Sequence, residues 1–240
     1  MKRGKVFLVG AGPGDPKLIT IRALEVLEEA EVVVYDRLVP ADILKHAKKA
    51  ELIYVGKSKG LHTIPQEIIN EILLKEASKG KKVVRLKGGD PYVFGRGGEE
   101  LIYLRERGIE VEYIPGITSA IAVPGVCDIP LTHRGFSSSL AIVTGHQDPT
   151  KDSSIRWAEL SRAVDTLVIL MGVGRIEKIV NEMRMDGETM VGIIEKGYSK
   201  EQRIITCKLK DLVETVKREK IKPPSIFVFG DVVKIYEMVR

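Results

Sequence analysis

The sequence is poor in cysteine and in aromatic residues. Only Cys127 and Cys207 occur among 240 residues, far apart and without a CxxC or histidine-adjacent pattern. This spacing excludes a secreted disulfide framework and a zinc module, so a reducing cytoplasm is the expected compartment. Aromatic residues make up 5% of the chain, too few to build a stacking platform for single-stranded nucleic acid.

Long apolar runs and side-chain amides are also scarce. No segment approaches the roughly 20 apolar residues of a membrane span, and residues 167–173 are among the longest candidates. The apolar stretch after the basic N-terminus stops at Gly10, well short of a signal peptide. We therefore expect a soluble protein. The few Asn and Gln residues, beside many Lys, Glu and Ile residues, are typical of proteins from hot habitats and lead to the hypothesis of a thermophilic source.

The charge balance is basic. The chain holds 38 Lys and Arg residues against 33 Asp and Glu residues, which gives a net charge of +5 and a pI near 9.0. Such a balance suits an acidic partner, whether nucleic acid, a membrane surface or a polycarboxylate ligand. The charges are interspersed, however, and the densest clusters, at 79–82 and 217–220, are typical of solvated helix ends.

Hydrophobic periodicity predicts two α/β halves. Short β-branched runs alternate with segments of helical period, which indicates βαβ units and a mainly parallel sheet with helices on both faces. The predicted strands span 6–9, 32–35, 52–55, 83–86 and 111–114, then 140–144, 167–171, 190–194, 203–208 and 225–229. The predicted helices span 18–29, 41–48, 65–78 and 98–107, then 155–162, 175–185, 209–217 and 232–238. Thr20 and Pro65 are predicted first-turn residues.

The boundary between the halves is placed by proline and glycine. These residues punctuate 115–135, as is typical of a connection between domains. The sequence therefore predicts an N-terminal α/β domain over 1–114 and a C-terminal α/β domain over 115–240. The strands at 190 and 203 are joined without room for a helix, so the second sheet is expected to be mixed.

Several motifs are incomplete. The glycine-rich turn 10–15 lies between a strand and a helix, but Asp15 stands where a dinucleotide fingerprint has its third glycine, which favours a ligand-binding turn of another kind. Gly56-Lys57-Ser58 lacks the first glycine of a phosphate-binding loop, which leaves Lys57 either in an active site or in solvent. Gly135 to Ser139 lacks the closing glycine of a nucleophile elbow. The four histidines have no metal-ligand spacing, and we expect no metal.

The richest segment spans 85–100. A strand ends in Gly88-Gly89-Asp90-Pro91, and a second glycine cluster opens a helix that carries Glu99 and Glu100 in its first turn. Acidic residues there complement the helix dipole, but five glycines in this stretch exceed what capping needs. They indicate a ligand lying against backbone, with Asp90 available to accept hydrogen bonds from hydroxyl or ammonium groups.

Dense motifs extend this segment in both directions. They include Gly10-Ala-Gly-Pro-Gly-Asp-Pro, Tyr35-Asp-Arg-Leu-Val, Val55-Gly-Lys57, His62 with Pro65-Gln66, Pro115-Gly-Ile-Thr-Ser and Pro130-Leu-Thr-His-Arg-Gly. Together they resemble the uroporphyrinogen-III C-methyltransferases, a family of tetrapyrrole (class III) methyltransferases that use S-adenosylmethionine. The resemblance continues more thinly through 166–172, 195–197 and 224–225.

The resemblance implies a fold and a cofactor site. The family has two α/β domains with the active site in the cleft between them, and S-adenosyl-L-homocysteine is the cofactor product. Serine at position 119, where relatives commonly have alanine, is a small departure. The positions that match the family's cofactor contacts are Pro13, Gly88, Gly89, Asp90, Val93, Thr118, Ser119, Met171 and Gly197.

The resemblance also implies a substrate and catalytic residues. Uroporphyrinogen III carries eight carboxylates and would be methylated at C2 and C7 to precorrin-2. Asp36 matches the family's proton acceptor and Lys57 its proton donor, whereas Arg96, Glu99 and Arg134 match residues proposed to bind or deprotonate the substrate. The choice of base among Asp36, Arg96 and Glu99 stays open, as does the pathway served, sirohaem or cobalamin.

The resemblance also implies an oligomeric state, and other functions remain as alternatives. The family is typically a homodimer, although the sequence does not locate its interface. The alternatives are a sister methyltransferase acting on a later precorrin, a non-catalytic binder of acidic tetrapyrroles, and a protein that binds nucleic acid through its basic charge. The resemblance favours neither nucleic acid nor a membrane as a partner.

Overall fold

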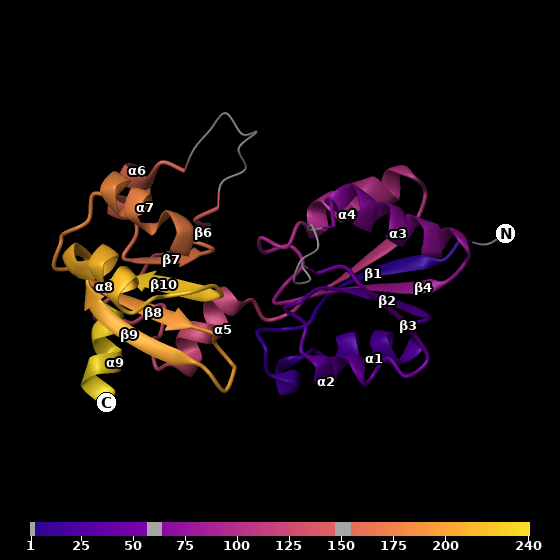
Figure 1. Ribbon diagram of the computed structural model, residues 1–240, viewed down its shortest axis with the longest axis horizontal. Coiled ribbons are helices and arrows are strands. Elements are labelled where there is room, and N and C mark those ends of the chain that lie inside the picture. The colour runs from indigo at the N-terminus through magenta and orange to yellow at the C-terminus, as the bar shows by residue number, and fades with distance from the viewer. Residues whose placement is uncertain (1–2, 57–63, 147–154) are drawn as a thin grey trace. The chain divides into compact units, whose positions relative to one another are not determined.

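Two compact units make up the chain. The computed structural model describes residues 3–56, 64–146 and 155–240. Its units are Met1–Ser119, here unit 1, and Ala120–Arg240, here unit 2 (Figure 1). The division falls five residues after the boundary that the proline and glycine pattern predicts. No helix in the described ranges has the length and hydrophobicity to cross a membrane.

Unit 1 is built on a sheet of five parallel strands in the order β3-β2-β4-β1-β5. The strands are β1 (Lys5–Gly10), β2 (Val32–Tyr35), β3 (Glu51–Tyr54), β4 (Lys82–Lys87) and β5 (Glu110–Ile114). The helices are η1 (Pro16–Leu18), α1 (Ile21–Glu29), α2 (Ala41–Leu44), α3 (Gln66–Ser78) and α4 (Gly97–Glu106). The predicted parallel α/β half is confirmed, and Thr20 caps α1 by accepting a hydrogen bond from the Ala23 amide.

Strand alternation divides the side chains of this sheet between two cores. Phe7 and Val9 of β1 face α1 and α2, whereas Val6 and Leu8 face α3 and α4. Figure 1 shows the two helix pairs on opposite faces of the sheet. Successive side chains of a strand point to opposite faces, so continuous β-branched runs suit a sheet that is covered on both sides.

Unit 2 is built on a mixed sheet in the order β6-β7-β10-β8-β9. Only β6 and β7 pair in parallel, and the β8–β9 pair is antiparallel, which confirms the predicted mixed sheet. The strands are β6 (Leu140–Thr144), β7 (Thr166–Leu170), β8 (Met190–Glu195), β9 (Arg203–Lys208) and β10 (Ser225–Phe229). The helices are α5 (Ser119–Val126), α6 (Trp157–Ala163), η2 (Val173–Arg175), α7 (Ile176–Glu182), η3 (Leu209–Asp211), α8 (Leu212–Arg218) and α9 (Val233–Val239).

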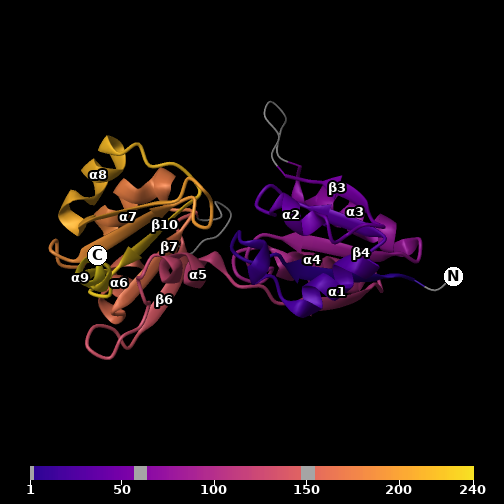
Figure 2. The ribbon, with the colours of Figure 1, turned by 90° about the horizontal axis from the view of Figure 1, so that it is seen from below.

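Two cores cover the faces of this second sheet. One contains side chains of α6, α7 and α8, and the other contains side chains of α5 and α9. Figure 1 shows α9 and α7 on opposite sides of the strands, and Figure 2 shows the same unit from the side of α9. Helix α5 lies where the sequence predicts only a punctuated connection, and it contains Pro124. Burial of Ala120 and Val123 in the core outweighs the helix-breaking tendency of that proline.

Candidate functional site

A glycine-lined edge lies at the carboxyl ends of the central strands of unit 1. Gly10 ends β1, Gly89 follows β4 and Gly116 follows β5. A Cβ atom on Gly116 would lie 2.2 Å from the Gly89 carbonyl oxygen, and one on Gly10 would lie 2.5 Å from the Gly116 Cα atom. The three loops therefore pack backbone against backbone, which leaves main-chain groups at the edge where parallel α/β sheets bind ligands.

Part of the predicted cofactor set converges on this edge. Gly89 has a φ of +66° and lies beside Thr118 and Ser119, because a Cβ atom on Gly89 would be 3.8 Å from the Thr118 Cα atom and 3.7 Å from the Ser119 nitrogen. Gly89 and Gly12 also exchange backbone hydrogen bonds of 2.7 and 3.2 Å. These bonds bring Pro13, the next residue of the β1 loop, to the same edge.

Asp90 ties the loops of this edge together. Its buried carboxylate accepts hydrogen bonds from the Tyr92 amide (2.8 Å), the Tyr113 hydroxyl (2.6 Å) and the Gly116 amide (3.1 Å). Burial, aided by the bond to Asp90, raises the pKa of Tyr113 well above its ordinary value, so the phenol stays a donor. The sequence assigns Asp90 to a ligand, and the structure shows its carboxylate largely engaged in holding the Gly116 loop.

The second glycine cluster presents side chains outward. Val93 is partly exposed, and Arg96 adopts a left-handed backbone with a φ of 60°. The Arg96 guanidinium binds both carboxylate oxygens of Glu99, at 2.9 and 2.6 Å, and this bonding raises the pKa of Arg96. The two predicted substrate contacts thus form a half-exposed bidentate pair beside the start of α4.

Asp36 follows β2, the strand next to β4. Its Oδ1 atom accepts a hydrogen bond from the Leu38 amide at 3.0 Å, and its Oδ2 atom lies 3.6 Å from Nη2 of Arg85. Leu38 also approaches the glycine-lined edge, because a Cβ on Gly88 would lie 2.7 Å from the Leu38 Cβ atom. Lys57, the predicted proton donor, lies outside the described residues.

A buried charge cluster lies behind Asp36, and the sequence reasoning missed it. Glu100 Oε1 accepts hydrogen bonds of 3.0 Å from Arg85 Nε, Lys87 Nζ and Gln66 Nε2. The signal was present in the spacing of Arg85 and Lys87, which places two cations on the same face of the strand as the apolar Val83. Charged residues at such positions are buried only when they are paired.

Unit 2 carries the remaining predicted cofactor residues at one edge of its sheet. Met171 follows β7 with a φ of 54° and is 52% exposed, and Gly197 follows β8. Both strands run antiparallel to β10, so their carboxyl ends lie at the same edge. A Cβ on Gly197 would lie 2.5 Å from the Val123 side chain of α5, so a larger residue there would have to displace that side chain.

Arg134 lies elsewhere in this unit. It belongs to a loop closed by hydrogen bonds between His133 and Ser137, and the loop precedes β6. Because β6 and β7 are parallel, this loop leaves the sheet at the edge opposite to Met171. Within unit 2 the structure therefore does not bring Arg134 to the predicted cofactor residues.

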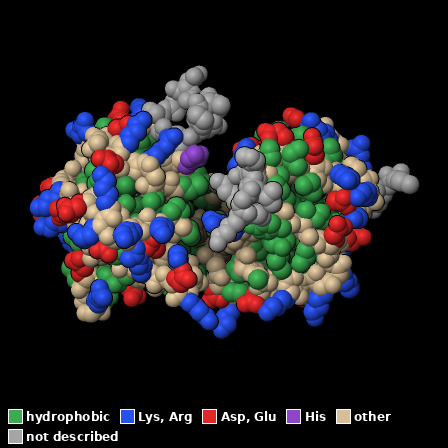
Figure 3. Space-filling model, viewed as in Figure 1, with side chains coloured by type: hydrophobic (Ala, Val, Ile, Leu, Met, Phe, Trp, Pro, Cys, Tyr) green, Lys and Arg blue, Asp and Glu red, His purple; other side chains and the backbone are tan. Residues whose placement is uncertain are grey.

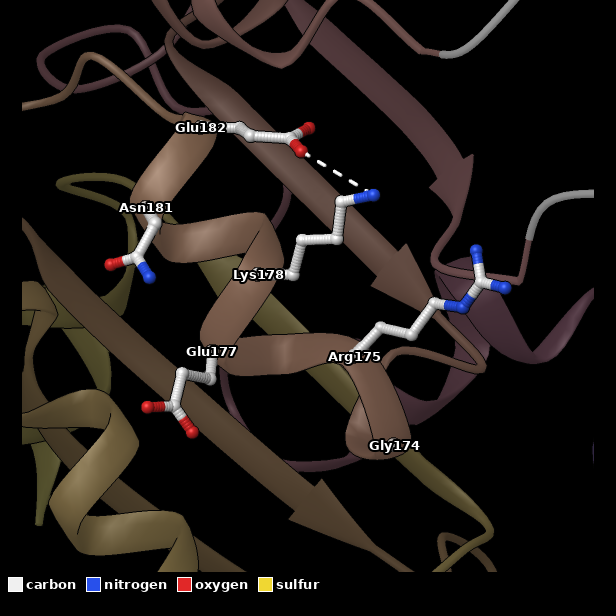
Figure 4. Close-up of a pocket in the computed structure, with 6 residues that line it drawn as sticks. All are labelled: Gly174, Arg175, Glu177, Lys178, Asn181 and Glu182. Atoms are coloured by element: carbon white, nitrogen blue, oxygen red, sulfur yellow. Dashed lines mark ion pairs between the residues drawn. The ribbon is translucent and has the colours of Figure 1, made fainter.

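A shallow hollow beside α7 is a poor alternative site. It is lined by Gly174, Arg175, Glu177, Lys178, Asn181 and Glu182 (Figure 4). The side chains point outward, with one ion pair of 3.7 Å between Lys178 and Glu182. No lining residue is buried, and no nucleophile stands beside a base. Within the described part of the chain, no group of three His, Cys, Asp or Glu residues is placed to hold a metal ion.

Known proteins resemble the chain over nearly its whole length. The uroporphyrinogen-III C-methyltransferase of Methanocaldococcus jannaschii is 52% identical over 98% of both chains. The S-adenosyl-L-methionine-dependent uroporphyrinogen III methyltransferase of Methanosarcina barkeri is 47% identical over 98% of this chain and 94% of the relative.

A solved structure and a family model point to the same family as these relatives. The uroporphyrin-III C-methyltransferase of Thermus thermophilus, complexed with S-adenyl homocysteine, matches with a TM-score of 0.83 and 41% identity, over 97% of this chain and 100% of that one. The model of the tetrapyrrole (corrin/porphyrin) methylases matches residues 5–213. By sequence and by fold, the chain belongs to the tetrapyrrole methylase family.

Proposed function

We propose that the protein transfers methyl groups from S-adenosylmethionine to carbon atoms of uroporphyrinogen III, at C2 and C7, giving precorrin-2. The observation that carries this proposal is the 47% identity, over 98% of the chain, to a relative named for that cofactor and that substrate. The glycine-lined edge of unit 1 supports it, because it offers backbone to a ligand where α/β sheets bind one.

In this proposal, each unit contributes residues that contact the cofactor. In unit 1, Gly88, Gly89, Thr118 and Ser119 provide small, closely packed backbone, and Asp90 holds it in place. In unit 2, the exposed Met171 and the side-chain-free Gly197 share one sheet edge. The bound cofactor supplies an electrophilic methyl group on a sulfonium, and S-adenosylhomocysteine is released.

The chain's own residues position the substrate and transfer protons to and from the macrocycle. An electron-rich pyrrole carbon needs little activation, so catalysis rests on alignment at about 3 to 3.5 Å and on removal of a proton from the macrocycle. Asp36 is the proposed acceptor of that proton, and Lys57 is the proposed donor of a separate proton to the macrocycle. Arg96, Glu99 and Arg134 are proposed to contact the substrate, whose carboxylates suit arginine forks.

The experiment combines the protein, labelled S-adenosylmethionine and uroporphyrinogen III under reducing conditions. Label in the tetrapyrrole is the expected result, and folded protein that transfers none would refute the proposal. Asp36→Ala should cripple turnover and leave the affinity for S-adenosylhomocysteine nearly unchanged. Asp90→Ala should weaken that affinity, because the Gly116 loop loses its tie. Equal losses of affinity in both variants would contradict this division of roles.

A sister methyltransferase of a later precorrin is the second candidate. The Tyr35-Asp-Arg-Leu-Val and Thr132-His-Arg-Gly segments argue against it. A panel of tetrapyrrole substrates decides between the two, since a later precorrin methylated faster than uroporphyrinogen III would favour the sister activity.

The cellular setting is proposed from the same resemblance. We propose a cytoplasmic homodimer from a thermophile whose product feeds sirohaem or cobalamin synthesis. Charges of both signs are interspersed on the face drawn in Figure 3, which suits a small acidic ligand better than a long nucleic acid. A mass by light scattering tests the dimer, and a melting midpoint above the common mesophile range of about 45 to 65 °C tests the thermophilic source.

A further inference from the structure

The charge cluster behind Asp36 holds an unusual set of buried groups. The Arg85 side chain is 3% exposed and that of Glu100 is fully buried. Lys87 is buried beside them, and burial, followed by the charge of Arg85, lowers the pKa of Lys87. Two cations thus lie on one face of β4, with Glu100 as the buried anion and Asp36 as the second anion nearby.

Stability alone does not explain this cluster. Ion pairs buried in a core are often no more stabilising than apolar side chains of similar volume, because each charge loses its hydration. The same face of β4 carries the apolar Val83, which packs with Leu73 and Leu104. Moreover, Glu100 Oε2 receives no hydrogen bond from the described residues. A buried carboxylate oxygen without a partner costs free energy, so the cluster needs an explanation other than stability.

The contacts of Arg85 supply that explanation. Its Nε atom donates to Glu100, and its Nη1 atom donates to the carbonyl oxygens of Val34 and Leu86, both at 3.3 Å. The guanidinium plane is therefore fixed from two sides, and Nη2 is directed toward Asp36. Because the Leu38 amide, in the turn after β2, holds the other carboxylate oxygen, both oxygens of Asp36 have a partner.

We propose that Arg85 is a positioning residue for Asp36, and that Glu100 and Lys87 fix Arg85 in the geometry that this requires. The inference rests on the proposed function, in which Asp36 accepts the proton. Arg85 orients the carboxylate and touches neither substrate nor cofactor. Around Asp36, the charged side chains of β4 are Arg85 and Lys87, Glu100 of α4 lies behind them, and Tyr54 is the titratable residue on β3 opposite Tyr35.

A double-mutant cycle tests the proposal. Turnover is measured for the wild type, Arg85→Met, Asp36→Asn and the double variant. We expect Arg85→Met to lower kcat about tenfold or more in the wild-type background and less than about twofold in the Asp36→Asn background. The KM and the affinity for S-adenosylhomocysteine should change less than about threefold. Equal loss of kcat in both backgrounds would mean a merely structural role and would overturn the inference.

Two further variants keep the test decisive. Arg22→Met removes an equal charge from an exposed pair on α1 and should leave kcat unchanged. Arg85→Lys keeps the charge but loses the fork, so partial recovery of kcat is expected, and this variant replaces Arg85→Met in the cycle if the latter does not fold. A wild type without methyl transfer would refute the proposed function itself. An active wild type with additive losses would refute only the role of Arg85.

Discussion

At the scale of single residues, the glycine-lined edge of unit 1 depends on residues that have no Cβ atom. Gly10 and Gly116 bring three loops into backbone contact only because neither carries a Cβ atom, and Gly89 contributes a left-handed backbone with a φ of +66°. A side chain at position 10 or 116 would push the loops apart by more than a rotamer change can absorb, since the atoms it meets belong to the backbone. The polar tie through Asp90 then selects one arrangement of the loops.

Gly116→Ala tests this dependence. Its new methyl group would lie 2.2 Å from the Gly89 carbonyl oxygen, so we expect a loss of stability of about 1–3 kcal/mol and a clear loss of affinity for S-adenosylhomocysteine. Gly98→Ala is the matched control, because a Cβ there meets no atom within 4 Å and alanine favours the helix by about 0.5–1 kcal/mol. Thermal unfolding and calorimetric titration measure both effects. Equal melting temperatures for the two variants would contradict the steric argument.

At the scale of elements, periodicity predicted most of the fold. The strands were found within one residue at each end because β-branched runs, bounded by charged or glycine-rich turns, are distinctive in parallel sheets. Helix α5 was missed because Pro124 and its neighbouring glycines are signals for a loop, and only tertiary burial of Ala120 and Val123 overrides them.

The candidate site was predictable only in part. Glycines beside strand ends mark a ligand edge in the sequence, and the structure places Gly89 in the closely packed loops at that edge. The pairing of Arg85 with Glu100 was missed because it joins a strand to a helix 15 residues later, and local pattern does not show which carboxylate turns inward. Likewise, the engagement of Asp90 with Tyr113 depends on the register of β5 beside β1.

Glu188, just before β8, forms ion pairs with Lys208 at the end of β9 and with Lys210 just after it, and this set of ion pairs is here called the clip. The clip gives a pH-dependent prediction. Hydrogen bonds from Lys208 and Lys210, both 2.5 Å, lower the pKa of Glu188 to about 2. The clip therefore contributes stability above the ordinary Glu pKa of about 4.5, and this contribution is lost as the pH falls from there toward 2.

The melting temperatures of the wild type and Glu188→Gln should accordingly differ at pH 7, and the difference should shrink below pH 4.5 and vanish near pH 2. The difference should be small, because the pair is exposed and screened by salt. Glu237→Gln on α9 controls for the loss of one negative charge. A difference between wild type and Glu188→Gln that persists unchanged at pH 3 would contradict the role of the clip.

At the scale of the whole molecule, the two units keep separate interiors. The two cores of unit 1 draw all their residues from Met1–Ser119, and the two cores of unit 2 draw theirs from Ala120–Arg240. A chain as long as one unit buries about two thirds of the surface that it exposes when unfolded, which is enough for independent folding. The units therefore have the properties of separate domains, each carrying part of the proposed cofactor set.

We predict that residues 1–119 and 120–240 fold as separate polypeptides. Each fragment keeps its full sheet and both of its cores, so each should unfold cooperatively and give a dispersed ¹H–¹⁵N spectrum, with a lower melting temperature than the full chain. Because Met171 and Gly197 lie in unit 2 and Gly88 and Gly89 in unit 1, neither fragment alone should bind S-adenosylhomocysteine with the affinity of the whole protein. The full chain is the control in each measurement. A fragment that shows no cooperative transition would mean that its cores are insufficient alone, whereas a fragment that binds as tightly as the full chain would restrict the cofactor site to that unit.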